Sequence, residues 1–412
     1  MQNKLLSDFR MVAKNQKLIS KEIQGYIFEN ENVDEKKLLL SKHEILGTPA
    51  PLVAIQIIGR RKAKRKLPSW YETTGILYPP SLNLEQSSSE ATGKFKIGII
   101  QRNLSTFEKA VDLTGGFGVD TFCFDKVFDH VVHVEPDAEL QQIAKHNHQL
   151  LGAIKVQYKH QPAAEFLQQN ADSVDLFYID PSRRNKAAKV FKLADCIPDV
   201  TELLADLFKQ SEYVLLKASP MLDVQQGLRE LKNVKQVWVV SVDNECKELL
   251  FLLKRHFSDE PVIDAVNLKK NGEPFQSFDF RFSEERQLKV NVGTLCQYLY
   301  EPNASILKAG AFQLIANRYG VYKIDVNTHL YSSDLRVTDF PGRIFKVVSI
   351  NPNSKQLRQL LPDGKANVVT RNYPLSPEGL KKKLKLKDGG EKYVIGFSEK
   401  KGKSIVVAER IK

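Results

Sequence analysis

A glycine-rich segment in the first third of the chain has residue types that could bind a phosphate- or nucleoside-containing ligand. The segment is Val111-Asp-Leu-Thr-Gly-Gly-Phe-Gly-Val-Asp120, and its glycines allow a sharp turn and a close approach of backbone to ligand. A helix that begins near Val119 favours negative charge at its N-terminus. Glu135 ends the next apolar run, where a carboxylate can accept hydrogen bonds from both hydroxyls of a ribose. The turn and the acid together predict a site for a nucleoside-containing cofactor.

Two residues in this segment bear on the kind of cofactor. A nicotinamide-binding loop prefers a third glycine in the pattern GxGxxG, but Thr121 occupies that position. Asp112 lies at the end of the preceding apolar run and suits a cofactor that carries an amino-acid ammonium group. Both features favour S-adenosylmethionine over a dinucleotide.

A second group of chemistry-bearing residues, Asp180-Pro-Ser-Arg-Arg184, follows the apolar run Val174–Ile179. At the end of a buried parallel strand, an acid lies at the edge of the sheet where ligands bind in open α/β folds. The arginine planes of Arg183 or Arg184 can stack on a base or bind a phosphate. The alternative interpretation is that Asp180 only caps the turn before Pro181.

The elements that must position these residues alternate between short apolar runs and helical patterns. The apolar runs at 110–113, 131–134, 174–179 and 213–216 are typical of strands buried on both faces of a parallel sheet. Helical patterns such as 138–151 and 197–210 separate them, which indicates βαβ units in a doubly wound sheet. The last two strands, 237–242 and 249–253, are joined by Asp243–Glu248, which is too short for a helical crossover, so we expect this pair to be antiparallel.

The sequence therefore predicts an α/β fold with a doubly wound, seven-stranded, Rossmann-like sheet whose last strand is antiparallel. A helical N-terminal region and an α+β C-terminal region flank it. We expect a helical region and linker at 1–93, with a Pro- and Ser-rich connector at 68–89, a cofactor-binding domain at 94–257, a small ferredoxin-like α+β segment at 258–300 and an α+β domain at 301–412. In the last domain, we expect one helix at 304–318 and a closing hairpin at 393–409.

Residues 94–256 resemble a class I S-adenosylmethionine-dependent methyltransferase, through the glycine-rich segment, Glu135 and the Asp180-Pro181 motif. The whole chain is similar to a bacterial group related to RNA cap guanine-N2 methyltransferases, with a THUMP-like C-terminal domain. The residues that carry this likeness are Tyr78-Pro-Pro80, Leu84-Glu-Gln-Ser-Ser-Ser-Glu90, Lys217-Ala-Ser-Pro-Met-Leu-Asp223, Asn244-Glu-Cys-Lys-Glu248, Tyr300-Glu-Pro-Asn303, Phe340-Pro-Gly-Arg343 and Arg371-Asn-Tyr-Pro374.

The resemblance implies an enzyme that uses S-adenosylmethionine to methylate an exocyclic nitrogen, guanine N2, in tRNA or rRNA. The predicted cofactor-binding residues are Asp112, Thr114, Gly115, Gly116, Phe117, Gly118 and Glu135, with Gln86 and Ser88 from a segment that could fold over the methionine end. The predicted catalytic residues are Asp180, Pro181, Ser182 and Arg183, of which Ser182 and Arg183 replace the usual second proline and aromatic residue. For the serine-rich segment around Ser88, a helix cap is the alternative.

Strand topology predicts further residues at the acceptor site. The carboxyl ends of parallel strands share one edge of the sheet, where ligands bind in open α/β folds. Lys217 lies at that edge, and we also place Glu245 and Lys247 there, on the connection between the last two strands. The alternative for Glu245 is a charged turn that faces solvent.

Charge and composition bear on the partner. The 412 residues contain 61 Lys and Arg against 49 Asp and Glu, a net charge of +12, which suits a polyanionic partner such as RNA. Two basic clusters are candidate RNA contacts, with solvated faces as the alternative. Their predicted RNA-binding residues are Arg60, Arg61, Lys62, Lys64, Arg65, Lys66, Lys381, Lys382 and Lys383.

Other classes of protein are disfavoured. The four cysteines form no CxxC pair, and the histidines show no metal-ligand spacing, so we expect no metal, reduced thiols and a cytoplasmic protein. No apolar window is long enough to predict a membrane span. Two alternatives to the RNA enzyme remain: a non-catalytic RNA-binding protein that keeps the fold, and a methyltransferase that acts on a protein or a small molecule.

Overall fold

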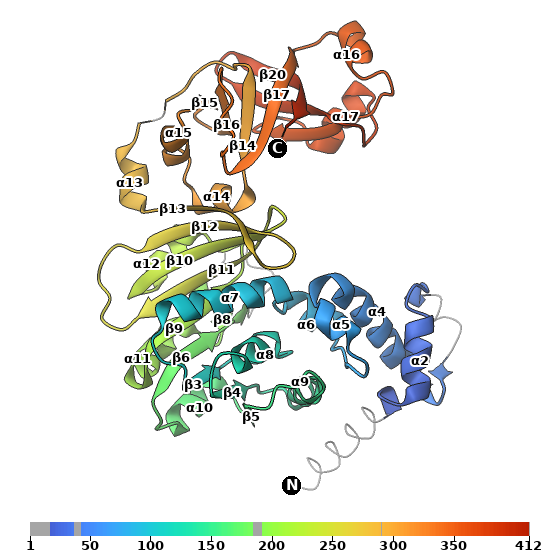
Figure 1. Ribbon diagram of the computed structural model, residues 1–412, viewed down its shortest axis with the longest axis vertical. Helices are drawn as coiled ribbons and strands as arrows, with labels where there is room; N and C mark the ends of the chain where they lie inside the picture. The colour runs from blue at the N-terminus through green and yellow to red at the C-terminus, as the bar shows by residue number, and fades with distance from the viewer. Residues whose placement is uncertain (1–16, 37–42, 184–191, 290, 412) are drawn as a thin grey trace. The chain divides into compact units, whose positions relative to one another are not determined.

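The computed structural model describes residues 17–36, 43–183, 192–289 and 291–411, which form two compact units (Figure 1). The first unit comprises Met1–Gln236, Glu248–Asp259 and Leu268–Pro274, and the second comprises Val237–Lys247, Glu260–Asn267 and Phe275–Lys412. Each unit is described by itself.

Five parallel strands form the centre of the first unit, in the spatial order β5-β4-β3-β6-β9. They are β3 (Lys109–Asp112), β4 (His130–Val134), β5 (Val156–Lys159), β6 (Val174–Ile179) and β9 (Ser211–Ala218). Strand β11 (Glu245–Lys254) pairs antiparallel with β9, with Leu249 opposite Ala218. The sheet continues through β10 (Val234–Val242), β12 (Val262–Leu268) and β13 (Pro274–Phe280). The predicted doubly wound sheet with an antiparallel last strand is confirmed, and β12 and β13 extend it to nine strands.

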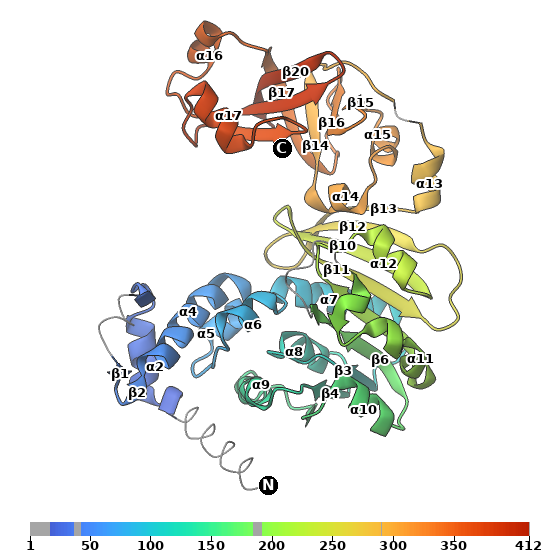
Figure 2. The ribbon, with the colours of Figure 1, turned by 180° about the vertical axis from the view of Figure 1, so that it is seen from behind.

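Helices cover both faces of the parallel strands, which explains why these strands are continuous apolar runs. Helices α7 (Glu90–Asn103), α8 (Val119–Asp125) and α9 (Ala138–Leu150) lie on one face. Helices α10 (Ala163–Gln169), α11 (Val200–Gln210) and α12 (Val224–Glu230) lie on the other, as the two opposite views show (Figures 1 and 2). Central residues such as Val111, Leu176 and Phe177 are completely buried, as two covered faces require.

The connection between β10 and β11 is shorter than the sequence predicted. Only Asp243 and Asn244 separate the two strands, and both have left-handed backbone, with φ values of 50° and 65°. Two such residues form the type I′ turn that matches the twist of a β-hairpin. The predicted six-residue connection was wrong because Glu245–Glu248 already belongs to β11.

The N-terminal residues of the first unit contain more helix than predicted. The helices are α2 (Lys21–Glu29), α4 (Ala50–Lys66), α5 (Pro68–Glu72) and α6 (Ser81–Gln86), and the short strands β1 (Glu44–Ile45) and β2 (Thr48–Pro49) pair with each other. The expected connector at 68–89 was wrong, because α5 and α6 lie within it. Trp70 in α5 and Leu84 in α6 are fully buried, so tertiary packing stabilises helices that the prolines and serines alone disfavour.

The second unit contains a seven-stranded sheet in the order β15-β16-β14-β17-β20-β19-β18. Its strands are β14 (Tyr298–Pro302), β15 (Tyr322–Asp325), β16 (Thr328–Ser333), β17 (Gly342–Ile350), β18 (Asn367–Arg371), β19 (Lys392–Glu399) and β20 (Gly402–Arg410), and its helices are α13 (Phe282–Gln287), α14 (Ala304–Ala309), α15 (Leu314–Tyr319), α16 (Ser354–Leu360) and α17 (Pro377–Leu384). The predicted hairpin at 393–409 is confirmed as β19 and β20.

The single helix predicted at 304–318 was wrong. Gly310 ends α14 with left-handed backbone, at φ 85°, and α15 begins only at Leu314. A glycine in this conformation is a common helix C-terminus.

In the described part of the chain, no helix is both long enough and apolar enough to cross a membrane.

The packing of α4 against Tyr78 gives a prediction for Gly59. Gln56 accepts a hydrogen bond from the backbone N–H of Tyr78 and donates one to its carbonyl, which brings Tyr78 against the helix. A Cβ at Gly59 would lie 2.2 Å from the Cβ of Tyr78, so Gly59→Ala should lower the free energy of unfolding by about 1–3 kcal/mol. A Cβ at Gly25 in α2 meets nothing within 4 Å, so Gly25→Ala is the matched control. Chemical denaturation measures both, and equal effects would contradict the described packing.

Candidate active site

The ends of β3, β4 and β6 meet at one edge of the parallel sheet, as predicted, and backbone hydrogen bonds join the loops that follow them. The Leu113 N–H donates to the Tyr178 carbonyl over 3.0 Å. The Gly115 N–H donates to the Val134 carbonyl over 2.9 Å. Across this edge, the Asp180 N–H donates to Oγ1 of Thr114 over 2.7 Å. The glycine-rich loop is therefore in direct contact with the Asp180-Pro181 segment.

Two buried histidines explain why the first and last glycines of this loop cannot carry side chains. A Cβ at Gly115 would lie 2.3–2.5 Å from ring atoms of His133, and one at Gly118 would lie 2.5 Å from Nε2 of His148. Burial lowers the pKa of His148 to about 4, and it lowers that of His133 well below the ordinary value. Both rings are therefore neutral core groups that shape the loop.

Gly116 has a different role, because its outer side is open. Its φ of +53° is left-handed, and a Cβ there would meet only the Thr114 carbonyl, at 3.6 Å. The nearby Glu135 carboxylate accepts hydrogen bonds from the Gly116 N–H and the Asp137 N–H, each over 2.8 Å. Burial raises the pKa of Glu135. A carboxylate held in this way keeps further lone pairs for the two hydroxyls of a ribose.

Asp112 is held rigidly beneath the loop. It is 1% exposed, and its carboxylate accepts hydrogen bonds from the Thr114 N–H at 3.1 Å and from the Thr121 hydroxyl at 2.7 Å. Burial raises the pKa of Asp112 to about 7, and the hydrogen bond from Thr121 offsets only part of this effect. A cationic ligand would therefore be favoured here, because it would stabilise the ionised form.

The side chains of two other predicted cofactor residues, Phe117 and Ser88, are engaged with other parts of the protein. The ring of Phe117 is buried against Trp70, with 4.8 Å between ring centroids, so Phe117 can contact a ligand only through its backbone. Ser88 is 4% exposed and donates to Asp120 over 2.6 Å. The backbone carbonyl of Gln86 lies 3.5 Å from Nζ of Lys217. The alternative of a helix cap holds for Ser89, which caps α7 together with Thr92.

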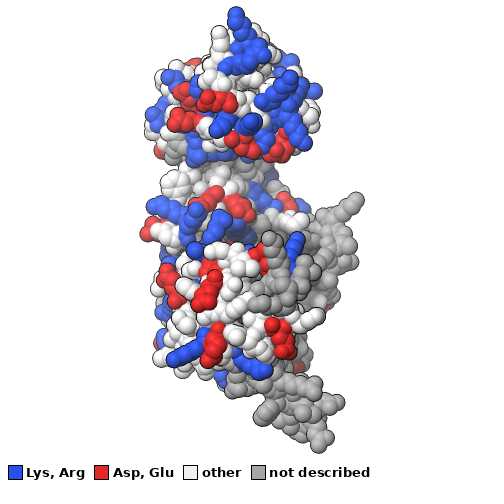
Figure 3. Space-filling view, turned by 90° about the vertical axis from the view of Figure 1, so that its right-hand side faces the viewer, with Lys and Arg blue, Asp and Glu red and all other residues white. Residues whose placement is uncertain are grey.

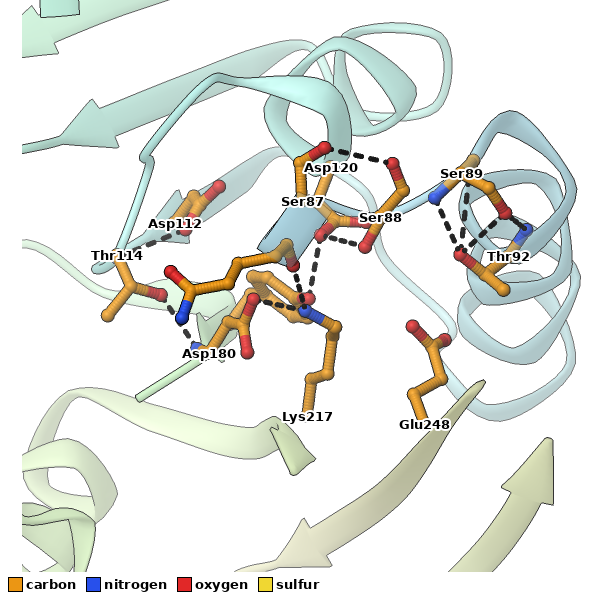
Figure 4. Close-up of polar contacts among 12 residues, drawn as sticks. Ser87, Ser88, Ser89, Thr92, Asp112, Thr114, Asp120, Asp180, Lys217 and Glu248 are labelled. Carbon is orange, nitrogen blue, oxygen red and sulfur yellow. Dashed lines mark hydrogen bonds and ion pairs between the residues drawn. The ribbon is translucent and has the colours of Figure 1, made fainter. Parts of the chain in front are cut away.

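Asp180 and Lys217 form an ion pair at the edge of the sheet (Figure 4). Asp180 follows β6, Lys217 lies in the adjacent strand β9, and the side chains are 31% and 10% exposed. Burial is the largest influence on the pKa of Lys217 and works to lower it, but the charges of Asp180, Glu248 and Asp120 together outweigh it and the net shift is upward. The predicted proximity of these two residues is confirmed.

A two-stranded ribbon follows the acceptor motif. Strand β7 (Ser182–Arg183) pairs antiparallel with β8 (Cys196–Ile197), and Ser182 lies opposite Ile197. Pro181 is buried, whereas Ser182 is exposed and Ile197 is 57% exposed. Arg184 and the side chain of Arg183 lie outside the described part of the structure, so their predicted stacking role stays a prediction.

A buried ion network that the sequence analysis missed lies directly behind these residues. Lys96 in α7 is completely buried, and its Nζ lies 3.0 Å from Oδ1 of Asp120 and 3.0 Å from Oε1 of Glu248. The Asp120 carboxylate also accepts hydrogen bonds from Ser88 and from the Tyr178 hydroxyl, the latter over 2.8 Å. The network thus joins α7, α8, β6 and β11.

Charge compensation keeps this network ionised. Burial alone would lower the pKa of Lys96, but the charges of Asp120 and Glu248 outweigh it and raise the pKa. Burial is the largest influence on Asp120 and would raise its pKa, but the charges of Lys96 and Lys217 and the hydrogen bonds to the carboxylate together lower it. Glu248 keeps a raised pKa because burial is its largest influence. The available sequence signal was Lys96 next to the apolar residue Phe95 and close to Ile99 and Ile100 in α7, together with Asp120 of the glycine-rich segment.

Glu245 and Lys247 are not brought to this edge by any described contact. Both belong to the second unit, and they form an ion pair with each other over 2.7 Å. Their side chains are 74% and 40% exposed, as a solvent-facing turn would be. Their assignment to the acceptor site stays a prediction.

Much of the basic run 60–66 is engaged within the first unit. Arg60 pairs with Glu31 at 3.2 Å, Arg61 pairs with Glu35 at 3.1 Å, and Lys62 pairs with Glu85. Lys66 donates to the carbonyls of Leu84 and Glu85, whereas Lys64 and Arg65 are exposed, and Lys64 has only a loose ion pair with Glu31 at 3.9 Å. These contacts fix α4 against α6 and leave less charge for RNA than the sequence suggested.

In the second cluster, Lys381 pairs with Glu378 and Asp388, and it is only 12% exposed. Lys382 and Lys383 are exposed. On the face drawn in Figure 3, basic side chains are interspersed with acidic ones.

The described residues contain no group of three or more His, Cys, Asp or Glu side chains placed to hold a metal ion, and the four cysteines are free thiols.

The fold and this site define a class I S-adenosylmethionine-dependent methyltransferase. The crystal structure of a "putative methyltransferase" from Porphyromonas gingivalis W83 is similar over 96% of this chain and 99% of that chain, with 32% identity and a TM-score of 0.81. The chain therefore belongs to the same family as the Porphyromonas gingivalis protein.

Further matches agree with this assignment. Proteins named "uncharacterized S-adenosylmethionine-dependent methyltransferase" from two strains of Mycobacterium tuberculosis are 22% identical over 213 residues. The match covers 51% of this chain and 56% of each relative, little more than half of their length. A ferredoxin-like domain model matches residues 298–341, and a THUMP domain-like model matches residues 342–410. From the sequence, we predicted a domain boundary at residue 300, between a ferredoxin-like segment at 258–300 and a THUMP-like domain at 301–412.

The residues present fit S-adenosylmethionine. The open side of Gly116 and the Glu135 carboxylate suit its ribose, and Asp112 suits its ammonium group. Asp180 and Lys217 lie on the side where a methyl acceptor must approach. These assignments to the individual side chains are proposals.

The raised pKa of Asp112 predicts a pH-dependent affinity. Below about pH 7 the carboxyl is largely protonated and cannot pair with an ammonium group. The affinity for S-adenosylmethionine should therefore rise roughly fivefold to tenfold between pH 6 and pH 7.5. In Asp112→Asn this part of the rise should be lost, while any contribution from Glu135 remains in both proteins. Calorimetric titration measures the difference, and identical pH profiles would contradict the role of Asp112.

The network predicts a large stability effect for Lys96. Lys96→Met leaves Asp120 and Glu248 buried without their ammonium partner, which should lower the free energy of unfolding by about 3–5 kcal/mol. Lys94 lies two residues away on the same helix and is exposed, so Lys94→Met is the matched control and should change stability by less than about 0.5 kcal/mol. Urea denaturation distinguishes the two, and a stable Lys96→Met protein would contradict the structural role of the network.

Proposed function

We propose that this chain transfers a methyl group from S-adenosylmethionine to an exocyclic base nitrogen of RNA, with guanine N2 of tRNA or rRNA as the acceptor. The observation that carries the proposal is the placement of Asp180. Its backbone N–H is bound to Thr114 of the glycine-rich loop, and its carboxylate lies at the edge of the sheet beside Lys217. An acceptor bound to Asp180 is therefore next to the cofactor loop.

The chemistry needs positioning more than proton transfer. When bound, S-adenosylmethionine would supply an electrophilic methyl group on a sulfonium. The methyl carbon forms a bond to the acceptor nitrogen as its bond to sulfur breaks, S-adenosylhomocysteine leaves, and the proton that the alkylated nitrogen loses passes to the Asp180 carboxylate or to solvent. The Asp180 carboxylate, together with a backbone carbonyl beside Pro181, accepts hydrogen bonds from the base amine and directs the nitrogen lone pair away from the protein and toward the cofactor side. Holding the two reactants in this geometry removes much of the entropic part of the barrier.

Lys217 complements Asp180 as a hydrogen-bond donor at the same place. A carboxylate and an ammonium side by side match an amine next to a ring acceptor, which is the pattern of guanine N2 and N3. The Lys217 ammonium is fixed by Asp180 and lies 3.5 Å from the Gln86 carbonyl. In this proposal Lys217 therefore contacts the base, and its ion pair also sets the orientation of Asp180.

The ribbon after the acceptor motif supports base binding without the usual aromatic residue. Opposite residues of an antiparallel pair lie on the same face, so Ile197 provides an exposed apolar side chain next to Ser182. Apolar side chains can pack against an unstacked base, and the plane of Arg183 remains a candidate for stacking.

The match to a THUMP domain-like model supports RNA as the acceptor, since such domains imply RNA docking outside the catalytic pocket. Exposed Lys382 and Lys383 in the second unit and Lys64 and Arg65 in the first are the basic side chains best placed for phosphate contacts. Arg60, Arg61, Lys62, Lys66 and Lys381 have intramolecular partners, and they would have to exchange these to bind RNA.

The proposal predicts a lost modification. Nucleosides from the RNA of a strain that lacks this chain should lack one methylated guanosine, which mass spectrometry identifies by base and by atom. The purified chain should then restore it in that RNA with labelled S-adenosylmethionine. If every RNA modification persists in the deletion strain, the RNA assignment is wrong, and label incorporation into protein or a small molecule would identify the acceptor class instead.

Asp180→Asn tests the acceptor site on the same RNA. The neutral amide keeps the size of the side chain but loses one accepting oxygen and the pair with Lys217, so transfer should fall about 100-fold. The affinity for S-adenosylmethionine should change less than about threefold. Asp195→Asn is the control, because Asp195 is exposed in the loop that precedes β8. An Asp180→Asn protein with the wild-type rate would contradict the role of Asp180.

A further inference from the structure

Most of the net charge of the chain lies in residues 342–410. This part contains 16 Lys and Arg against 6 Asp and Glu, an excess of 10, whereas the rest of the chain contains 45 against 43. Within it, the segment 354–391 alone contains 9 Lys and Arg against 4 Asp and Glu. The net charge of +12 is therefore almost entirely a property of the last domain, and not of the basic run 60–66.

Five exposed lysines of this segment lie where α17 ends and β18 begins. Lys382 and Lys383 are in the last turn of α17, and Lys385 follows the helix with left-handed backbone, at φ 58°. Lys387 forms a parallel β-bridge with Lys365, in which backbone hydrogen bonds of 2.8 and 3.0 Å involve the N–H and the carbonyl of Lys387. We call these five lysines the basic face.

The bridge places two like charges next to each other. Paired residues of neighbouring strands project to the same side, where like charges are destabilising. The negative end of the α17 dipole stabilises Lys382 and Lys383, but it does not account for a pair of lysines, Lys365 and Lys387, outside the helix. A bound anion would remove this repulsion.

The carboxylates of the same segment do not neutralise the basic face. Glu378 and Asp388 both pair with Lys381, which is not part of the face. The other two, Asp363 and Glu391, are exposed. Within the described residues, no ion pair joins any lysine of the basic face to a carboxylate. Its five charges are therefore available to a partner.

The surface around these lysines has the composition of a phosphate-binding surface and not that of a protein interface. In the segment 351–391, all of which is described, no large apolar side chain is exposed. Leu357, Leu361 and Leu384 instead pack inward against the sheet. The cores of protein interfaces are rich in aromatic residues and poor in lysine, whereas lysines that neutralise phosphates dominate binding to nucleic acids.

We propose that the basic face binds the phosphate backbone of RNA and holds the substrate at the last domain without regard to its sequence. The inference rests on the proposed function for RNA as the partner. It assigns a role to Lys365, Lys385 and Lys387, and it ranks this surface above the run 60–66, where most of the cations have partners within the protein. Phosphate binding also relieves the repulsion between Lys365 and Lys387.

A triple variant of the full chain, Lys365→Gln with Lys385→Gln and Lys387→Gln, tests the proposal. Fluorescence anisotropy measures its affinity for bulk tRNA and for ribosomal RNA between about 50 and 200 mM salt. The slope of log affinity against log salt should become shallower by about two to three, because each phosphate contact contributes about 0.7–0.9. At about 100 mM salt the affinity should fall at least tenfold for both RNAs, since phosphate contacts carry no sequence information.

The matched control removes three lysines from the same domain, as Lys400→Gln with Lys401→Gln and Lys403→Gln. These lysines are exposed around the turn between β19 and β20, and the eight residues of β19 separate this turn from the basic face. The control should lose less than about threefold in affinity. Equal losses in the two triple variants would overturn the proposal, because net charge alone would then explain the binding.

Two further measurements keep the result unambiguous. The free energy of unfolding of the first variant should stay the same or rise, because the substitutions remove a repulsion. The corresponding triple Lys→Arg variant should keep the wild-type salt slope, and a slope as shallow as that of the glutamine variant would overturn the proposal. Poly-L-glutamate tests the other class of partner, and binding as tight as that of tRNA at the same salt would overturn the assignment to RNA.

These titrations need neither cofactor nor methyl transfer, so the two proposals can fail separately. If the deletion strain keeps every RNA modification, the proposed function is wrong, but the difference between the two triple variants still supports the basic face. If the first triple variant binds RNA as tightly as the wild-type chain, the basic face is wrong and the methyl-transfer proposal stands.

Discussion

The buried contact of Lys96 with Asp120 and Glu248 is the interaction on which the site depends. An ammonium group with no exposed surface is tolerated only when carboxylates compensate its charge, and the two that do so come from α8 and β11. Asp120 follows the glycine-rich loop by two residues, and Glu248 lies one residue before the segment of β11 that pairs with β9. The position of one lysine in α7 is thereby coupled to the cofactor loop and to the antiparallel strand. Ser88 donates to Asp120 and accepts from Lys96, so the segment before α7 is fixed by the same network.

This coupling explains why so many polar groups can be buried close to one another without loss of order. Asp112 ends β3 and Asp180 follows β6, so both strands place a carboxylate at this edge. The Asp180 N–H donates a hydrogen bond to Oγ1 of Thr114, which joins the loops after the two strands. Behind them, neutral His133 and His148 fill the space that side chains at positions 115 and 118 would need. The loop geometry therefore comes from packing as much as from glycine flexibility, and the open side of Gly116 is left for the ligand.

The sheet could be predicted from the sequence because its strands are continuous apolar runs that have to be buried on both faces. The residues at its carboxyl edge followed from topology, and Asp180 and Lys217 proved to be in contact. The ion network could not be derived in the same way, because pairing between Lys96 and Glu248 depends on how distant segments pack. The predicted linker at 68–89 contains helices α5 and α6 because Trp70 and Leu84 are buried there. Burial of these side chains outweighs the low helix propensity of a proline- and serine-rich segment. The ion pairs of the basic run 60–66 could not be predicted, because composition does not show that Glu31, Glu35 and Glu85 lie opposite it.

The site thus consists of a glycine-rich loop shaped by buried histidines, the acid Asp180 held against that loop, and the buried ion network of Lys96, Asp120 and Glu248. The central claim is that the transferred methyl group lies between the glycine-rich loop and Asp180. Sinefungin is an analogue of S-adenosylmethionine that carries an amine in place of the methyl sulfonium, so a crystal structure of the full chain with bound sinefungin tests this claim directly. The account predicts that the ribose hydroxyls contact Glu135, that the amino-acid ammonium lies toward Asp112, and that the amine at the sulfonium position faces Asp180. A ligand that leaves Glu135 uncontacted, or whose amine faces away from Asp180, would contradict it.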